Sequence, residues 1–179
     1  MQDNAMKQIK IAKLTLNIGA GKEQQVLERG VVLLKQITGV DPIKTITQKR
    51  IPGWGLRPGL PIGCMITLRR EDAEKLLKRL IIAKNNMLSQ SNFDNEGNLS
   101  FGIKEYIDIP ETKYDPKIGI MGLQASLTLE RPGFRIKKRK VLKRTVPRVH
   151  RISKTDSIEF MKKNFGLKIK EEQQDQEQR

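Results

Sequence analysis

The sequence predicts an α+β fold, with a mainly antiparallel sheet, helices packed on one face, long basic loops and a disordered C-terminal tail. Short segments of alternating apolar and polar residues are interspersed with two longer segments whose apolar residues recur at helical spacing. Hairpin-length turns separate some of the alternating segments, which favours antiparallel pairing. The 179 residues can bury a core of their own. We expect one domain over residues 1–170 and a tail at 171–179.

The composition indicates a polyanionic partner. Thirty-five Lys and Arg against 20 Asp and Glu give a formal net charge of +15 and a pI of about 10.1. The sequence has no signal peptide and no apolar run of membrane-spanning length, so we expect neither secretion nor a membrane partner. The lone Cys64 and the lone His150 argue against a disulfide, a metal site or a metal cofactor. We interpret Cys64 as a small buried strand residue and His150 as one more donor in a basic run.

The first predicted strand covers residues 9–18. Its apolar parity slips between Ile11 and Leu14, so the strand is expected to be half-buried after the slip. The residues of its polar outer face are then Lys13, Thr15 and Asn17. A glycine-containing turn at residues 19–21 ends this strand. It lacks the lysine-threonine ending of a phosphate-cradling loop, so we interpret it as a strand-to-helix turn.

The next elements alternate between helices and strands. A helix is predicted over residues 23–38, where Gly39 ends it, and a short strand over residues 42–47 follows. After a loop, a strand is predicted over residues 62–68 and an amphipathic helix over residues 70–87. The two helices are expected to cover the same face of the sheet.

The C-terminal half adds two extended segments, at residues 101–109 and 120–129. A short amphipathic helix is predicted over residues 155–165, with Ser153 or Thr155 as its N-cap. Because the helices cover one face of the sheet, the other face is left to Lys, Thr, Asn and Arg. Such a face suits contact with a polar partner.

A long cationic loop over residues 48–60 precedes the strand at residues 62–68. Half of the ten positions from residue 51 to residue 60 are Gly or Pro, which neither a helix nor a sheet ladder tolerates. Trp54 lies beside Arg57 with no acid nearby, a combination that suits a sugar-phosphate backbone. The alternative is that Trp54 folds back into the core.

A second cationic segment runs from residue 131 to residue 151 and contains no acid. Its ten cations are Arg131, Arg135, Lys137, Lys138, Arg139, Lys140, Lys143, Arg144, Arg148 and Arg151. Like charge this dense repels itself, so we expect the segment to stay mobile until phosphate neutralises it. We interpret it as an RNA-contacting segment. A solvated tail and a localisation signal are the alternatives.

Four sequence runs together resemble a known family. They are LTLNIGAGK at residues 14–22, PIGCMITLRR at 61–70, FGIKEYIDIP at 101–110 and KYDPKIGIMGL at 113–123. In this order they resemble the fifth protein of the large ribosomal subunit, the universal 5S-rRNA-binding ribosomal protein. The resemblance covers roughly residues 6–166. The runs RPGF, starting at Arg131, and VHRIS, ending at Ser153, resemble its archaeal and eukaryotic branch.

The resemblance implies an α+β fold with RNA on the sheet face opposite the helices, and no enzymatic activity. It implies a cytoplasmic, ribosome-bound protein of the central protuberance. The implied partners are 5S rRNA, large-subunit rRNA, peptidyl-site tRNA and neighbouring ribosomal proteins.

The resemblance and the polar strand faces together suggest site residues. The expected 5S rRNA-binding residues are Lys13, Thr15, Asn17, Lys44, Thr67 and Arg69. Val40 stands where the bacterial pattern has a contacting Gln, and Lys44 is the candidate substitute. The expected tRNA-facing loop residues are Lys49, Arg50, Gly53, Trp54, Gly55, Leu56, Arg57 and Gly59.

Two other classes of function compete with this interpretation. A nucleic-acid-processing enzyme is disfavoured because the sequence shows no convincing acid cluster for two-metal chemistry and no His with an acid partner. The adjacent Glu71 and Asp72 fall at a predicted helix start, where acids complement the helix dipole. A DNA-binding architectural protein is the other alternative. Co-purification of a stoichiometric small RNA would separate the ribosomal interpretation from both.

Overall fold

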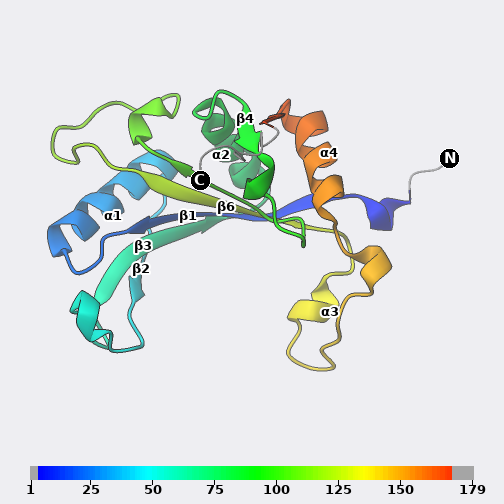
Figure 1. The fold of residues 1–179 in the computed structure, drawn as a ribbon, viewed down its shortest axis with the longest axis horizontal. Helices are drawn as coiled ribbons and strands as arrows, with labels where there is room; N and C mark the ends of the chain where they lie inside the picture. Colours follow the sequence, from blue (N-terminus) through cyan, green and yellow to red (C-terminus); the bar gives the residue numbers. More distant parts are fainter. Residues whose placement is uncertain (1–3, 171–179) are drawn as a thin grey trace, which may run out of the picture.

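The fold is built on a five-stranded sheet in a computed structural model that describes residues 4–170 (Figure 1). The strand order is β2-β3-β1-β6-β5, and every neighbouring pair is antiparallel. The strands are β1 (Lys10–Gly19), β2 (Ile43–Ile46), β3 (Pro61–Leu68), β5 (Leu99–Ile103) and β6 (Leu123–Glu130). The mainly antiparallel α+β fold is therefore confirmed. The tail predicted at residues 171–179 lies outside the described residues.

Helices cover one face of this sheet (Figure 1). Helix α1 (Gln24–Thr38) packs on β3, α2 (Arg70–Ile82) packs on β1, and α4 (Lys154–Phe165) lies on the same side. The core lies between helices and strands, and it includes Leu27, Leu33, Leu34 and Ile37 of α1 and Leu76, Leu77, Leu80 and Ile81 of α2. No helix within residues 4–170 is long and apolar enough to cross a membrane.

The parity slip in the first strand is a β-bulge. The pairing of β1 with β6 shifts register between Ile11 and Lys13, and Ala12 is buried at the irregularity. Beyond it, Leu14 and every second residue after it point into the core. Lys13 and every second residue after it point to the other face. The predicted outer face of this strand is thus confirmed.

Helix boundaries follow from local backbone chemistry. Gly39 adopts φ 72° and ends α1 as predicted. The prediction that α2 reaches residue 87 is wrong, because Asn85 and Asn86 adopt left-handed φ values of 54° and 56° just after the helix. Ser153 rather than Thr155 caps α4, in a capping box.

Long-range pairing accounts for the other differences. Met87 begins β4 (Met87–Ser89), which pairs in parallel with β7 (Lys168–Lys170), and neither strand was predicted. Three-residue strands have too few residues to show a period. The extended segment expected at residues 101–109 turns after Ile103 into a 3₁₀ turn, Tyr106–Asp108.

Tyr106 ties the connection after β5 to the core. Its side chain is fully buried, and its hydroxyl accepts a hydrogen bond from the backbone N–H of Asp115 at 2.9 Å. The hydroxyl of Thr112 donates to the Tyr106 carbonyl at 2.8 Å. These bonds hold the long β5–β6 connection against the edge of the sheet.

Replacing Tyr106 with Phe removes the acceptor for the Asp115 N–H without changing the packed ring. We expect a loss of about 1–3 kcal/mol in the free energy of unfolding, because a part-buried donor is left without its partner. Tyr114→Phe is the control, since Tyr114 is exposed and the change should stay within about 0.5 kcal/mol. Urea denaturation checks this. Equal midpoints for the two variants would show that the hydroxyl contributes nothing.

Candidate nucleic-acid interface

The sheet face opposite the helices carries a row of hydroxyl groups, which we call the hydroxyl row. It runs across four strands, from Thr67 through Thr15 and Ser126 to Ser100, because these residues are direct cross-strand partners. The Oγ1 atoms of Thr15 and Thr67 are 3.4 Å apart, and the Oγ atoms of Ser126 and Ser100 are 3.3 Å apart. Each hydroxyl can donate or accept, so the row can adapt to a partner's donors and acceptors.

A second polar row lies beside it. Asn17 pairs across the strands with Gln124 on one side and Met65 on the other. The Asn17 Nδ2 atom donates to Gln124 Oε1 at 3.4 Å, a long and exposed bond. Both amides therefore keep donor and acceptor capacity for a partner. The β6 residues Gln124 and Ser126 had not been proposed as site residues, although their alternation in the predicted strand was the signal that could have identified them.

Most of the predicted sheet-face residues come together, but Lys44 does not. Lys44 is the cross-strand partner of Cys64, whose Sγ lies against Gly30 of α1. Direct partners point to the same face of a sheet, so Lys44 lies on the helix-covered side and not beside Asn17. Burial also raises the pKa of the Cys64 thiol, as expected for an inert core residue. Arg69 is exposed and continues the extended backbone of β3 beyond Thr67.

The cationic loop is a closed, ordered projection. Ile51 and Leu56 exchange two backbone hydrogen bonds, of 3.0 and 3.1 Å, around the 3₁₀ turn Pro52–Trp54. The Trp54 side chain is 70% exposed, so the alternative of a core tryptophan is wrong. Leu56 is only 6% exposed. The structure therefore corrects the expectation for Leu56, whose side chain anchors the loop and cannot face a partner.

The basic segment, residues 131–151, is a second projection. In Figure 1 it hangs, like the cationic loop, on the side of the sheet away from α1 and α2, at the other end of the molecule. It contains the short helix α3 (Arg135–Lys138), and the Arg144 N–H donates to the Ile136 carbonyl at 3.2 Å. Part of the segment thus has local structure, and its mobility before phosphate neutralises it stays a prediction.

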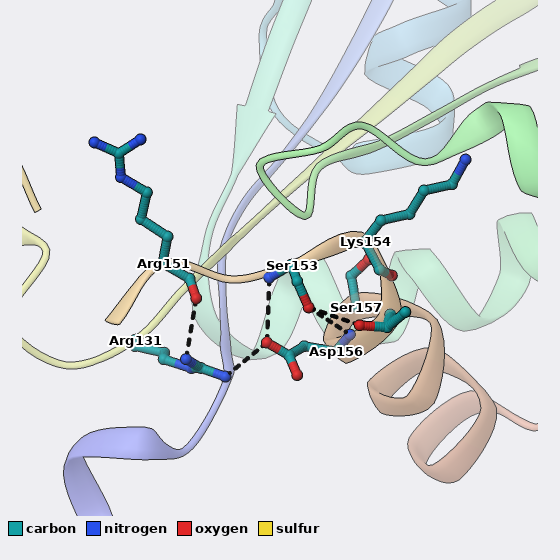
Figure 2. Close-up of polar contacts among 7 residues, drawn as sticks. Arg131, Arg151, Ser153, Lys154, Asp156 and Ser157 are labelled. Atoms are coloured by element: carbon teal, nitrogen blue, oxygen red, sulfur yellow. Dashed lines mark hydrogen bonds and ion pairs between the residues drawn. The ribbon is translucent and has the colours of Figure 1, made fainter. Parts of the chain in front are cut away.

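Both ends of the basic segment meet in an arginine clasp, formed by Arg131, Arg151, Ser153 and Asp156 (Figure 2). Arg131 donates from Nη1 to the Arg151 carbonyl at 3.1 Å and from Nη2 to Asp156 Oδ2 at 3.0 Å. The same Oδ2 accepts the Ser153 N–H at 3.1 Å. The clasp holds together two points that are 20 residues apart in sequence.

The clasp corrects the role expected for Arg131. Its side chain is only 12% exposed, so it is a structural residue and not a free cation for RNA. Its Nε atom is buried and has no hydrogen-bond partner among the described residues. Neither partner was predicted, although the Ser-x-x-Asp pattern at 153–156 signals a capping box whose carboxylate could also accept from a nearby Arg.

Three other cations of the basic segment contact acceptor groups of the protein itself. Lys137 pairs with Glu96 at 3.1 Å, Lys138 pairs with Glu130, and Arg139 donates to the Leu142 carbonyl at 2.8 Å. These contacts are exposed and exchange readily with water or phosphate. The exposed cations of this segment that have neither an acid partner nor a side-chain hydrogen bond among the described residues are Arg135, Lys140, Lys143, Arg144 and Arg148.

His150 has a local structural role. Its Nε2 lies 2.8 Å from the Pro132 carbonyl, and its ring meets Phe134 edge-on with centroids 5.7 Å apart. Across residues 4–170, no group of three His, Cys, Asp or Glu side chains is placed to hold a metal ion.

A helix-backed sheet with a polar open face between two cationic projections has the character of a nucleic-acid-binding protein. Family models agree with this class. Residues 4–57 match the model described as "Ribosomal protein L5", and residues 61–160 match the model that describes the C-terminus of the same ribosomal family. The chain therefore belongs to the ribosomal protein L5 family.

Archaeal relatives support the same membership along almost the whole chain. "Large ribosomal subunit protein uL5" of Sulfolobus acidocaldarius is 46% identical over 170 residues, which are 95% of this chain and 96% of the relative. Its counterpart in Methanobrevibacter smithii is 43% identical over 164 residues, covering 92% and 96%. That of Nanoarchaeum equitans is 43% identical over 168 residues, covering 93% and 99%.

These matches confirm the resemblance and its archaeal character. The chain is a structural constituent of the large ribosomal subunit, and it resides on the ribosome in the cytoplasm. It is not an enzyme.

The clasp can be tested with Asp156→Asn, which keeps an oxygen for the Ser153 N–H but removes the charge that faces Arg131. We expect the free energy of unfolding to fall by about 1–3 kcal/mol, because a largely buried guanidinium loses its counter-charge. Asp41→Asn is the matched control. It breaks the exposed pair with Lys35 and should cost no more than about 0.5 kcal/mol. Equal urea midpoints for both variants would contradict the clasp.

Proposed function

We propose that the chain binds 5S rRNA through the open face of its sheet and links it to the large-subunit rRNA in the central protuberance. In this proposal the cationic loop reaches the peptidyl-site tRNA, and neighbouring ribosomal proteins complete the contacts. The observation that carries the proposal is the hydroxyl row, with Asn17 and Gln124 beside it, on a rigid sheet.

Short polar side chains on a sheet suit a folded RNA. The wide, shallow minor groove of an RNA helix displays 2′-hydroxyls, which donate and accept hydrogen bonds as Thr and Ser do. A row with strand spacing of about 4.8 Å presents these groups at regular intervals. The flanking Lys13 and Arg69 add charge without displacing the hydroxyls. The positive charge then contributes binding affinity, while the short hydroxyl and amide groups fix the position of the protein on the RNA.

The two projections suit separate RNA contacts. Trp54 is exposed on the ordered loop, and a Trp face with a nearby Arg can stack on a base or hold a phosphate. This supports the proposed contact with tRNA. The free cations of the basic segment support the proposed contact with large-subunit rRNA, since this segment lies at the other end of the molecule from the cationic loop (Figure 1).

The experiment that tests the proposal is a salt titration of the full chain with isolated 5S rRNA. We expect log K to fall linearly with log salt, by roughly 0.7–0.9 per phosphate neutralised, so the total slope counts the contacts. A duplex DNA of equal length should compete poorly, because it lacks 2′-hydroxyls. A flat salt dependence, or equal competition by DNA, would refute the proposal.

Asn17→Ala tests the sheet face directly. We expect weaker 5S rRNA binding by about 1–3 kcal/mol, because a partner on the RNA is left without its hydrogen bond. The unfolding midpoint should move little, since the Asn17 amide makes only a long, exposed bond within the protein. Lys44→Ala is the control on the opposite sheet face and should bind 5S rRNA as the wild type does. If Lys44→Ala were the more damaging change, the open face would be the wrong interface.

Trp54→Ala separates the loop from the sheet. We expect the free energy of unfolding to stay within about 0.5 kcal/mol, because Trp54 is exposed, and 5S rRNA binding to be unchanged. Retention of peptidyl-site tRNA by reconstituted ribosomes should weaken through loss of the aromatic face. A large fall in the free energy of unfolding would mean that the ring packs in the core.

A further inference from the structure

A cavity of about 480 Å³ lies beneath the basic segment. Its lining residues are Glu96, Phe134, Lys137, Lys143, Arg144, Thr145, Val146, Arg151 and Ile152. Sites for small organic ligands span about 300–1,000 Å³, so this cavity can take a single aromatic ring system with its substituents. It is separate from the open sheet face and from the cationic loop.

The inner walls of the cavity are apolar and fixed. Val146 and Ile152 are almost completely buried, and the half-buried Phe134 ring is held by its edge contact with His150. Gly97 adopts φ 79°, and a Cβ there would lie 2.5 Å from Ile152 Cγ2. The turn at residues 94–98 can therefore lie directly against Ile152, which sets Glu96 at the cavity.

The mouth of the cavity is cationic. Lys143 and Arg144 are exposed there, and the Arg144 backbone is fastened to Ile136. Arg151 is oriented by donating from Nε to the Val146 carbonyl at 3.0 Å. Glu96 is the single acid among the lining residues, and its Oε2 is 3.1 Å from Lys137 Nζ.

From this combination we propose that the cavity binds one unpaired nucleotide of rRNA, with guanine as the preferred base. The base lies against Phe134, Val146 and Ile152, and its phosphate lies on Lys143 and Arg144. The inference rests on the proposed contact between the basic segment and rRNA. A base inside a duplex cannot enter such a cavity, so the ligand is a nucleotide from a loop, bulge or single strand.

Glu96 provides the base preference. A carboxylate accepts hydrogen bonds and cannot donate them. The Watson–Crick edge of guanine presents two adjacent donors, N1–H and the N2 amino group, which match two carboxylate oxygens. Lys137 engages Glu96 only through an exposed pair that exchanges readily. An acidic peptide fits less well, because its carboxylates would meet Glu96.

The test uses the full chain with a uridine heptamer that carries one central guanosine, and with the same heptamer carrying adenosine. Phe134→Leu removes the aromatic face but keeps an apolar side chain, and we expect about tenfold weaker binding with an unchanged salt slope. Phe160→Leu is the matched control, since Phe160 is also half-buried beside a second aromatic ring, Phe165. It should bind as the wild type does.

Two further variants separate charge from base recognition. Lys143→Gln should lower the salt slope by about 0.7 through loss of one phosphate contact. Glu96→Gln should abolish the preference for the guanosine heptamer over the adenosine heptamer. Supporting results are a slope change confined to Lys143→Gln, weaker binding at an unchanged slope for Phe134→Leu, and loss of the guanosine preference in Glu96→Gln.

Clear results would overturn the inference. Wild-type affinity of Phe134→Leu for the guanosine heptamer, with normal unfolding, would mean that the cavity stays empty and the contact is electrostatic. Equally strong competition by an oligoglutamate peptide would assign the cavity to an acidic protein partner. Binding of 5S rRNA is measured in parallel. Equal affinity of the wild type for the guanosine and adenosine heptamers, with intact 5S rRNA binding, overturns this inference alone. Failure of the wild type to bind 5S rRNA overturns the proposed function as well.

Discussion

The register of β1 between β3 and β6 is the constraint on which the rest of the structure depends. A slip of one residue would turn every side chain of a strand to the opposite face, which would bury Asn17 and expose Leu16. The bulge between Ile11 and Lys13 sets this register on the β6 side. Both the apolar core and the hydroxyl row follow from the same alignment. Core packing therefore also fixes the surface that we propose for RNA.

The cationic loop and the basic segment are held in shape by different kinds of contact. The cationic loop closes on itself through backbone bonds between Ile51 and Leu56 and needs few side chains. The basic segment is longer and more charged, and it depends on the arginine clasp. That clasp leaves the Arg131 Nε atom buried without a partner in the described part of the chain. Burying two charges costs desolvation, so the Arg131–Asp156 pair is better explained by the position that it gives the basic segment than by a gain in folding free energy.

Local patterns predicted much of the fold and part of the site. The alternation of β1 predicted the outward direction of Thr15 and Asn17, and the exposed Trp54 agrees with its Gly- and Pro-rich surroundings. The predictions that failed concern residues whose partners are distant in the sequence. The face of Lys44 follows from its pairing with β3, and the burial of Arg131 follows from an acid 25 residues away. Neither the pairing of Lys44 with β3 nor the contact between Arg131 and its acid produces a periodic pattern in the amino-acid sequence.

The placement of β1 at the centre of the sheet has a consequence for biosynthesis. This strand leaves the translating ribosome before β6 does, and Asn17 meets its partner Gln124 across 107 residues of sequence. The sheet cannot close until β6 has emerged, and such long-range closure is slow because loop entropy is lost before contacts form. During that interval an apolar strand and many unpaired cations are accessible together. The nascent chain is therefore most vulnerable to aggregation and to stray nucleic acid before its last sheet strand has been made.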